Sequence, residues 1–220
     1  TFRLSNDNIG SPSPSLDLST LLNVQIVNSH VTSLQNFSYT GNHVANVSFT
    51  GCTVIAPVNF YRTITTGAPL ATQLFIVDST VDTANYTIYI TTIFTQNQNL
   101  PYLTAINSNI SSLYISSQTN NGNDNDQLFT MASISYCNIT SAQLLTTAVM
   151  TPRGIFHHLV DHSNISSLFT SSTSVSFIAN SHMGAFSSVS RPDLYQATYL
   201  VFENSTSVSF IANSHMGAFS

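Results

Sequence analysis

Residues 23–31 read NVQIVNSHV, and the same pattern of residue types returns as NVSFTGCTV at 46–54 and YLTAINSNI at 102–110. Each stretch has an apolar residue two places before a turn-forming residue, a small residue directly after it, and an apolar residue three places after it. The pattern occurs seven times, centred on Asn28, Gly51, Asp78, Asn107, Tyr136, His162 and Asn180. Successive centres are 23, 27, 29, 29, 26 and 18 residues apart, which indicates a repeated structural unit.

The second apolar position of each repeat comes five residues after the first, and five is an odd number. Side chains alternate between the faces of a strand, so both positions can face one core only if the chain turns a corner between them. Asn, Gly and Asp tolerate the left-handed backbone of such a corner. We therefore expect corners at Asn28, Gly51, Asp78, Asn107 and Asn180, whereas Tyr136 and His162 fit less well. The small residues should form one file inside the corner: Ser29, Cys52, Ser79, Ser108, Cys137, Ser163 and Ser181.

A strand, a corner and a second strand, repeated along the chain, describe one coil of a β-solenoid. A single coil cannot bury its own apolar face, so coils stack at about 4.8 Å and share a continuous core. The sequence therefore predicts an all-β parallel β-helix with coils of roughly 18–29 residues. A β-sandwich, whose strands also alternate, is the alternative fold.

The stretches at 23–31, 46–54 and 102–110 resemble the repeat of right-handed parallel β-helix proteins with the pectate-lyase-like architecture. The likeness covers roughly residues 22–186 and implies an Asn at the tight turn between two short strands. Residues 201–219, VFENSTSVSFIANSHMGAF, are more faintly similar to repeats of polymorphic surface adhesins with β-helical passenger domains. The double-glycine element of those adhesin repeats is absent.

The organisation expected along the chain is an extended lead-in or cap at 1–20 followed by a solenoid over 21–220. A polar run at 116–127 reads as a long loop that leaves the solenoid. The sixteen residues STSVSFIANSHMGAFS occur twice, at 172–187 and at 205–220. This duplication leads us to expect that the chain belongs to a longer array of repeats.

Charged residues make up 6% of the chain and hydrophobic residues 42%, with no Lys and a formal net charge of −5. No basic patch can neutralise phosphates, so nucleic-acid binding is not expected. No apolar run approaches the roughly 18 residues of a membrane helix, so membrane insertion is not expected. The scarcity of charged groups also leaves few candidates for catalysis. We expect no catalytic residue, no metal and no cofactor.

Several residues have side chains suited to catalysis or metal binding, and we interpret them as structural. Asp78 and Asp82 could share a face, and NNGNDND at 120–126 superficially resembles a calcium loop but lacks the acidic final ligand. The densest cluster of possible metal ligands is His157, His158 and His162, which we interpret as surface or lining histidines.

The two cysteines occupy the small position of coils that are three steps apart. Cys52 and Cys137 should then lie on the order of 14 Å apart at the stacking distance, whereas a disulfide requires Cα atoms within about 7 Å. We expect two free, buried thiols that take the place of serine.

Acceptor motifs for N-linked glycans occur at seven positions: Asn36, Asn46, Asn85, Asn109, Asn138, Asn164 and Asn204. Together with the lack of Lys, they favour an extracellular or cell-surface glycoprotein. Asn109, Asn138 and Asn164 occupy the same outward position of three successive coils. Glycans there would follow one edge of the solenoid.

The function favoured by these features is structural: a segment of a fibre, stalk or adhesin with axial self-association. The first alternative is a carbohydrate-binding or carbohydrate-cleaving β-helix, with Tyr86, Tyr89, Tyr102 and Tyr114 as stacking groups. The second alternative is a β-sandwich filament subunit that assembles by strand exchange through its N-terminal segment.

Overall fold

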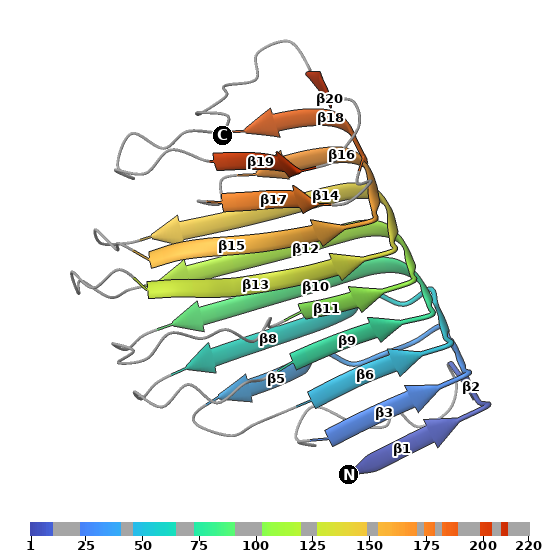
Figure 1. The fold of residues 1–220 in the computed structure, drawn as a ribbon. Coiled ribbons are helices and arrows are strands. Elements are labelled where there is room, and N and C mark those ends of the chain that lie inside the picture. Colours follow the sequence, from blue (N-terminus) through green and yellow to red (C-terminus); the bar gives the residue numbers. More distant parts are fainter. Residues whose placement is uncertain are drawn as a thin grey trace.

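The computed structural model is an all-β parallel solenoid, in which each coil adds one strand to one sheet and one or two strands to the other (Figure 1). This confirms the fold class expected from the sequence. The structure describes residues 1–10, 23–40, 46–64, 73–90, 103–119, 127–148, 154–170, 174–178, 182–188, 199–203 and 208–210.

Two parallel sheets, here named sheet A and sheet B, enclose the core. Sheet A has nine strands: β1 (Phe2–Ser5), β3 (Asn23–Val27), β6 (Asn46–Thr50), β9 (Gln73–Val77), β11 (Leu103–Ile106), β13 (Gln127–Ser135), β15 (Gly154–Asp161), β17 (Ser174–Ile178) and β19 (Tyr199–Glu203). Sheet B has eleven strands: β2 (Asn8–Ile9), β4 (His30–Val31), β5 (Phe37–Thr40), β7 (Thr53–Val54), β8 (Val58–Ile64), β10 (Thr80–Ile90), β12 (Asn109–Thr119), β14 (Asn138–Ala148), β16 (Asn164–Thr170), β18 (His182–Ser188) and β20 (Val208–Phe210).

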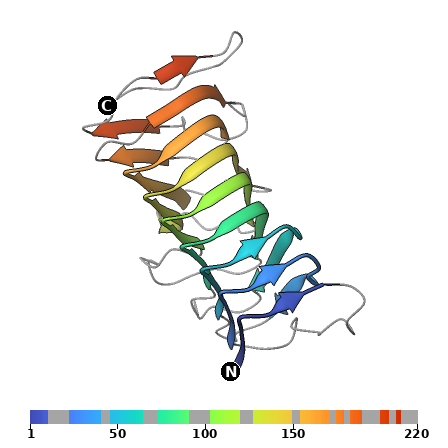
Figure 2. The same ribbon diagram turned by 90° about the vertical axis from the view of Figure 1, so that its right-hand side faces the viewer.

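The pairing between successive coils of sheet B follows the spacing of the sequence repeats. The pairs run His30↔Thr53, Thr53↔Thr80, Thr80↔Asn109, Asn109↔Asn138, Asn138↔Asn164 and Asn164↔His182. Every described strand pair is parallel and joins one coil to the next, so the β-sandwich alternative is wrong. Seen from the corner side, the short strands and their turns lie directly above one another (Figure 2).

The solenoid begins earlier than the sequence suggested. β1 pairs with β3, with Leu4 beside Ile26, and β2 pairs with β4. Asn6 has a φ of 58°, so it forms a corner like those of later coils. The first ten residues of the lead-in or cap expected at 1–20 therefore form a coil of the solenoid instead of an unpaired extension, and residues 11–20 lie outside the described part of the chain. Asp7 stands where later coils have a small residue, which hid this coil in the sequence.

The polar loop expected at 116–127 is also partly wrong. β12 continues through Thr119 and pairs with β10 on one side and β14 on the other. β13 begins at Gln127, and residues 120–126 lie outside the described residues. Backbone hydrogen bonds to two neighbouring strands hold residues 116–119 in the sheet, and their polar side chains do not prevent this pairing.

The last full repeat differs from the sequence alignment by one residue. Val160 pairs with Phe177, and Ile178 pairs with Asp161 instead of taking the apolar position opposite Val160. Three residues separate Ile178 from His182, whereas two separate Asp161 from Asn164. Asn180 and Ser181 fall in this gap and lie outside the described residues.

The inward columns form one core. At the position two places before the corner, Ile26, Phe49, Ile76, Ala105, Ile134 and Val160 are all fully buried. Within sheet B, the ring of Phe60 stacks on those of Phe37 and Tyr86, at centroid distances of 6.2 and 5.0 Å. Burial of one large apolar side chain contributes about 1.5–3 kcal/mol, so this shared column is the main source of stability between coils.

Candidate functional site: the corner and the outer faces

The corner residues adopt the left-handed backbone that the repeat pattern predicts. The φ angles are 49° at Asn28, Asp78 and Asn107, and 64° at Gly51. Tyr136 and His162 also have positive φ, at 55° and 45°, although large side chains disfavour this conformation. Their rings stack at 4.8 Å with an interplanar angle of 17°, and this contact offsets part of the conformational cost.

Each corner is hydrogen-bonded to the coil above it. The backbone N–H of Asn28 donates to the carbonyl of Thr50 at 2.8 Å, and that of Asp78 donates to Ile106 at 3.0 Å. Tyr136 donates in the same way to Asp161 at 3.0 Å. The backbone N–H groups at these three corners are therefore all hydrogen-bonded, and the bonds hold each corner in register with that of the next coil.

The small residues after the corners form one buried file, here named the inner file. Its members are at most 4% exposed: Ser29, Cys52, Ser79, Ser108, Cys137 and Ser163. The N–H of Cys52 donates to Ser79 Oγ at 3.0 Å, and the N–H of Ser79 donates to Ser108 Oγ at 3.1 Å. Each hydroxyl thus accepts a hydrogen bond from the coil before it.

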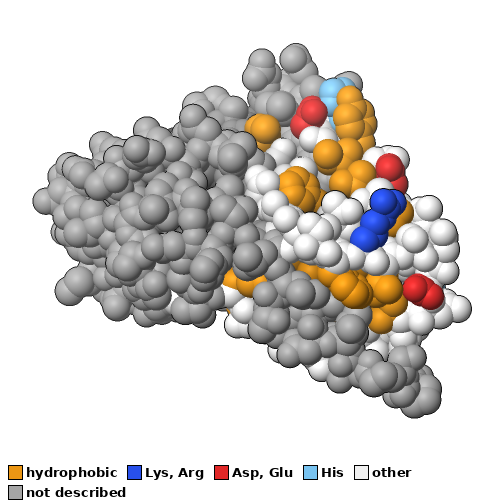
Figure 3. Space-filling view, turned by 90° about the horizontal axis from the view of Figure 1, so that it is seen from below, with side chains coloured by type: hydrophobic (Ala, Val, Ile, Leu, Met, Phe, Trp, Pro, Cys, Tyr) orange, Lys and Arg blue, Asp and Glu red, His pale blue; other side chains and the backbone are white. Residues whose placement is uncertain are grey.

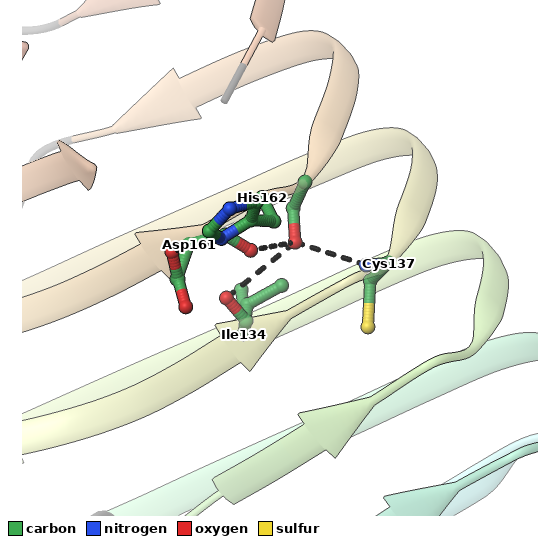
Figure 4. A network of polar contacts seen from close by, with 5 residues as sticks. Ile134, Cys137, Asp161 and His162 are labelled. Carbon is green, nitrogen blue, oxygen red and sulfur yellow. Dashed lines mark hydrogen bonds and ion pairs between the residues drawn. The ribbon is translucent and has the colours of Figure 1, made fainter. Parts of the chain in front are cut away.

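The serine hydroxyls also donate, which completes their hydrogen bonding. Ser163 Oγ donates to the carbonyl of Asp161 at 2.7 Å and lies 3.5 Å from that of Ile134, while it accepts from the N–H of Cys137 at 2.9 Å (Figure 4). The same arrangement surrounds Ser79 and Ser108. A buried side chain of this size that both donates and accepts satisfies backbone groups of two coils at once.

The cysteines of the inner file are free and buried, as the spacing of the coils predicts. Cys52 Sγ lies 3.3 Å from the carbonyl of Ile26, and Cys137 Sγ lies 3.2 Å from that of Ser135, so each thiol occupies the place of a serine hydroxyl. Burial raises the pKa of the Cys137 thiol, against a smaller opposing effect of backbone hydrogen bonds with Ser108 and Ser135. The neutral thiol is therefore the form that the fold favours.

Side chains at the corners interact both between coils and within one coil. Asn107 Nδ2 donates to Asp78 Oδ1 of the preceding coil at 2.7 Å, and His162 Nδ1 lies 2.6 Å from Asp161 Oδ1 of the adjacent residue. A Cβ added to Gly51 would lie 2.4 Å from Asn28 Oδ1. Glycine is favoured at this corner for two reasons: it adopts the positive φ without strain, and the absence of a side chain leaves space for the side-chain amide of Asn28.

Two files of asparagine follow the outer face of sheet B and contain most of the glycan acceptors. Asn59 Nδ2 donates to Asn36 Oδ1 at 2.8 Å, and Asn85 Nδ2 donates to Asn59 Oδ1 at 2.7 Å. In later coils, Asn138 Nδ2 donates to Asn109 Oδ1 at 3.2 Å. Asn36, Asn109 and Asn138 are exposed to solvent.

Two further acceptor residues are less exposed, including Asn164, which pairs with Asn138 in the same column. Asn46 starts β6 in sheet A, Asn164 starts β16 in sheet B, and both are half-buried. Their side-chain oxygens are buried and have no hydrogen-bond partner. Asn204 lies outside the described residues.

The possible ligating groups that the structure describes do not form a cluster. His158 points into the core at 1% exposure, whereas His162 lies at the half-exposed corner. The side chains of His157, Asp124 and Asp126 lie outside the described part of the structure. Among the residues that are described, no group of three His, Cys, Asp or Glu could hold a metal ion. Asp78 and Asp82 are both exposed, and Asp78 accepts the bond from Asn107.

The tyrosines proposed as sugar-stacking groups differ in their exposure to solvent. Tyr86 is fully buried against Phe60, so its interpretation as an exposed stacking group is wrong. The pattern of alternation predicts this burial, because Ala84 and Tyr86 share a face. Tyr114 is half-buried. The side chains of Tyr89 and Tyr102 are not among those described.

Sequence reasoning missed a polar group inside the core. Val58, Phe60 and Arg62 alternate on β8, and all three are buried, with Arg62 only 1% exposed. Tyr39, opposite Arg62 on β5, is also buried, and this burial raises its pKa to about 12. The alternation of residues along β8 predicts that Arg62 faces the core, but a charged side chain is rarely buried, so this prediction was not made.

Comparisons with known proteins found no match: no protein family, no curated protein and no solved structure resembles the chain closely enough to identify it. The fold therefore defines the class to which this protein can be assigned, that of parallel β-solenoids. In the described part of the chain, no helix is long and apolar enough to cross a membrane.

Proposed function

We propose that this solenoid is a structural segment of an extracellular or cell-surface glycoprotein, as part of a fibre, stalk or adhesin. The observation that carries the proposal is the continuity of the inner file, which links successive coils through the same buried hydrogen bonds. Coils joined in this way can add length and stiffness without any change in cross-section. Of the two resemblances seen in the sequence, that to surface adhesins fits this role.

A mechanical role can be tested by pulling single molecules from their ends. Coils in this chain span between 22 and 29 residues, apart from the short step between β16 and β18, so release of one coil should lengthen the chain by about 75–100 Å. We expect stepwise unfolding with increments of this size. A chain that extends at low force without such steps would contradict the proposal.

The glycoprotein part of the proposal rests on the position of the acceptors. Asn36, Asn85, Asn109, Asn138 and Asn164 all lie on the side of sheet B. Expression in secreting eukaryotic cells, followed by peptide-N-glycosidase, should lower the mass of the protein. Glutamine at all seven acceptors should abolish that shift. An unmodified protein secreted by these cells would remove this part of the proposal.

Axial self-association is a further part of the same proposal. Figure 3 views the molecule from the side of the first coil, and among the described residues that it colours, charged side chains are fewer than apolar and uncharged ones. Among the described strands, β1 pairs with β3 alone and β2 with β4 alone, so within this part of the chain each has one edge to which another strand could add. Arg3→Pro would remove a backbone N–H from β1. If axial stacking occurs at this edge, the substitution should shorten the assemblies seen by electron microscopy.

Carbohydrate binding is a second candidate, favoured by one exposed aromatic group. Tyr61 is 40% exposed on the outer face of β8, two residues from Asn59 in the asparagine file. An aromatic face beside amide groups is suited to stacking on and hydrogen bonding to a sugar. Tyr61→Ala should abolish binding on a glycan array, whereas Ile55→Ala, at a 53% exposed position, should not. Absence of any bound glycan would reject this candidate.

A further inference from the structure

The outer face of sheet B holds a small grid of side chains around one exposed tyrosine. On β8, Asn59 and Tyr61 point outward, because Phe60 between them is buried, and Tyr61 is 40% exposed. β5 and β10 pair with β8 on its two sides (Figure 1). The outward residues of the grid are, strand by strand, Asn36 and Ser38, Asn59 and Tyr61, and Asn85 and Thr87.

The strands on both sides of Tyr61 carry an acceptor motif for an N-linked glycan, NFS at 36–38 and NYT at 85–87. The middle residue of each motif is buried in the core, so the asparagine and the hydroxyl residue face outward together. Ser38 and Thr87 lie directly opposite Tyr61 on the two neighbouring strands. A sugar attached to either asparagine therefore starts from the same face as the tyrosine ring.

Asn36 is the acceptor of this pair whose amide is better placed to carry a sugar. It is exposed, and its Oδ1 accepts a hydrogen bond from Asn59 Nδ2 at 2.8 Å, which orients the side chain. No hydrogen bond within the described residues uses Asn36 Nδ2, the atom to which a glycan is joined. Asn85 is half-buried, and its Nδ2 donates to Asn59 Oδ1 at 2.7 Å. A sugar on Asn36 thus leaves the asparagine file intact.

The ring of Tyr61 lies within reach of a sugar on Asn36. The two residues are one strand and two positions apart, which places their Cα atoms roughly 8 Å from each other. The asparagine side chain and one pyranose ring together span a similar distance. The apolar C–H face of the sugar can then pack on the face of the aromatic ring, and removal of both surfaces from water is favourable.

We propose that the first sugar of a glycan on Asn36 packs on Tyr61 and holds β5 against β8. This inference rests on the proposed function, in which the protein is a glycoprotein, and it names the group that covers one exposed aromatic ring. Among the described strands, β5 pairs with β8 alone, so a contact that joins the two strands adds to the attachment of β5. The sugar on this surface is then part of the same molecule and not a separate saccharide.

Removal of this one glycan tests the contact. Ser38→Ala eliminates the acceptor motif but keeps the Asn36 amide and its bond to Asn59. In protein secreted by eukaryotic cells, S38A should lower the equilibrium constant of folding by about three- to tenfold. In chains that also carry Tyr61→Ala, S38A should have no further effect. Protein from a bacterial host without N-glycosylation should show no effect of S38A in either case. Urea denaturation followed by circular dichroism measures each constant.

Three controls separate this contact from general effects of a glycan. Ser111→Ala removes the acceptor motif of Asn109 on β12, which pairs with β10 and β14 instead of β8, so its effect should be the same with Tyr61 and with Y61A. Tyr61→Phe keeps the aromatic ring and should preserve the effect of S38A. Trimming the glycan to its first sugar with an endoglycosidase should leave the stability of the wild-type chain unchanged.

Mass spectrometry of the secreted protein distinguishes the possible failures. If no acceptor asparagine carries a glycan, the glycoprotein proposal is wrong and the contact falls with it. If other acceptors are modified but Asn36 is not, the contact alone is refuted. The same holds if Asn36 is modified and S38A has an equal effect in chains with Tyr61 and with Y61A. An effect of S38A that disappears with Y61A and persists with Y61F supports the contact.

Discussion

Two files of short polar side chains run along this solenoid at the same spacing, one inside the corner and one on the outer face of sheet B. The inner file has hydrogen bonds of 2.9–3.2 Å between coils, and the outer asparagine file has bonds of 2.7–3.2 Å. Their geometry is similar, but their surroundings differ, because the inner residues are buried and most outer residues are in contact with water.

The comparison shows that the contribution of a hydrogen bond between coils to stability depends on whether water can replace the lost partner. Without its partner, a buried N–H has no acceptor, which costs about 1–3 kcal/mol. An exposed amide that loses its partner binds water instead. The inner file should therefore determine the stability of the solenoid, whereas the outer file should be open to substitution and modification.

The largest effect is expected for Ser79→Val. Valine removes the acceptor for the N–H of Cys52 and forces a methyl group toward the carbonyl of Val77, which lies 2.7 Å from Ser79 Oγ. The two effects together should lower the free energy of unfolding by about 3 kcal/mol. Urea denaturation followed by circular dichroism measures this. A loss below 1 kcal/mol would mean that the corner has more space than the structure indicates.

Ser79→Ala should have an intermediate effect of about 2 kcal/mol, because it removes the hydrogen bonds without crowding the corner. Ser79→Cys is the matched control, since cysteine already occupies this position in two other coils. It should cost less than the alanine variant. Equal losses for alanine and cysteine would show that hydrogen bonding is not what this position requires.

Cys137→Ser should change stability by less than about 1 kcal/mol near neutral pH, and should alter its pH dependence. The thiol pKa is higher in the folded chain than in the unfolded chain. As pH rises past the ordinary thiol pKa of about 8.5, the unfolded chain loses its proton first, so the stability of the native protein falls. Denaturation between pH 7.5 and 9.5 should show a shallower decline for the serine variant. Identical declines would contradict this role of Cys137.

The smallest effect is expected for Asn59→Ala. This substitution breaks both bonds of the outer file, to Asn36 and from Asn85, yet should cost at most about 0.5 kcal/mol because water replaces the lost partners. The same denaturation assay compares it directly with Ser79→Ala. A loss as large as that of the inner variant would abolish the distinction between the two files.

The repeat pattern predicted much of the fold, because its determinants are local. Positive φ at Asn28, Gly51, Asp78 and Asn107 follows from residues that tolerate that backbone. The burial of the small residues follows from the confined space behind each corner. The first coil was missed because Asp7, an exposed residue, occupies the small position there. Nothing in the composition of residues 1–10 marks Leu4 and Ile9 as coil positions without the pairing partners that the structure supplies.

One repeated segment shows that the local sequence does not determine which sheet a strand joins. Val175–Phe177 lies in β17 of sheet A, whereas the identical residues Val208–Phe210 lie in β20 of sheet B. The difference arises because Tyr199–Glu203 already forms the strand of sheet A that pairs with β17. A strand of this composition can join either sheet, and the strand that is available next to it determines which one it joins.

The amino-acid sequence alone therefore determined the coil length, the corner and the inner file, since these depend on backbone sterics and on the alternation of side chains within a few residues. Only the tertiary structure decided that Arg62 is buried and that the second copy of the repeat changes sheets. These properties depend on which strands lie side by side, and that arrangement exists only after the coils have stacked.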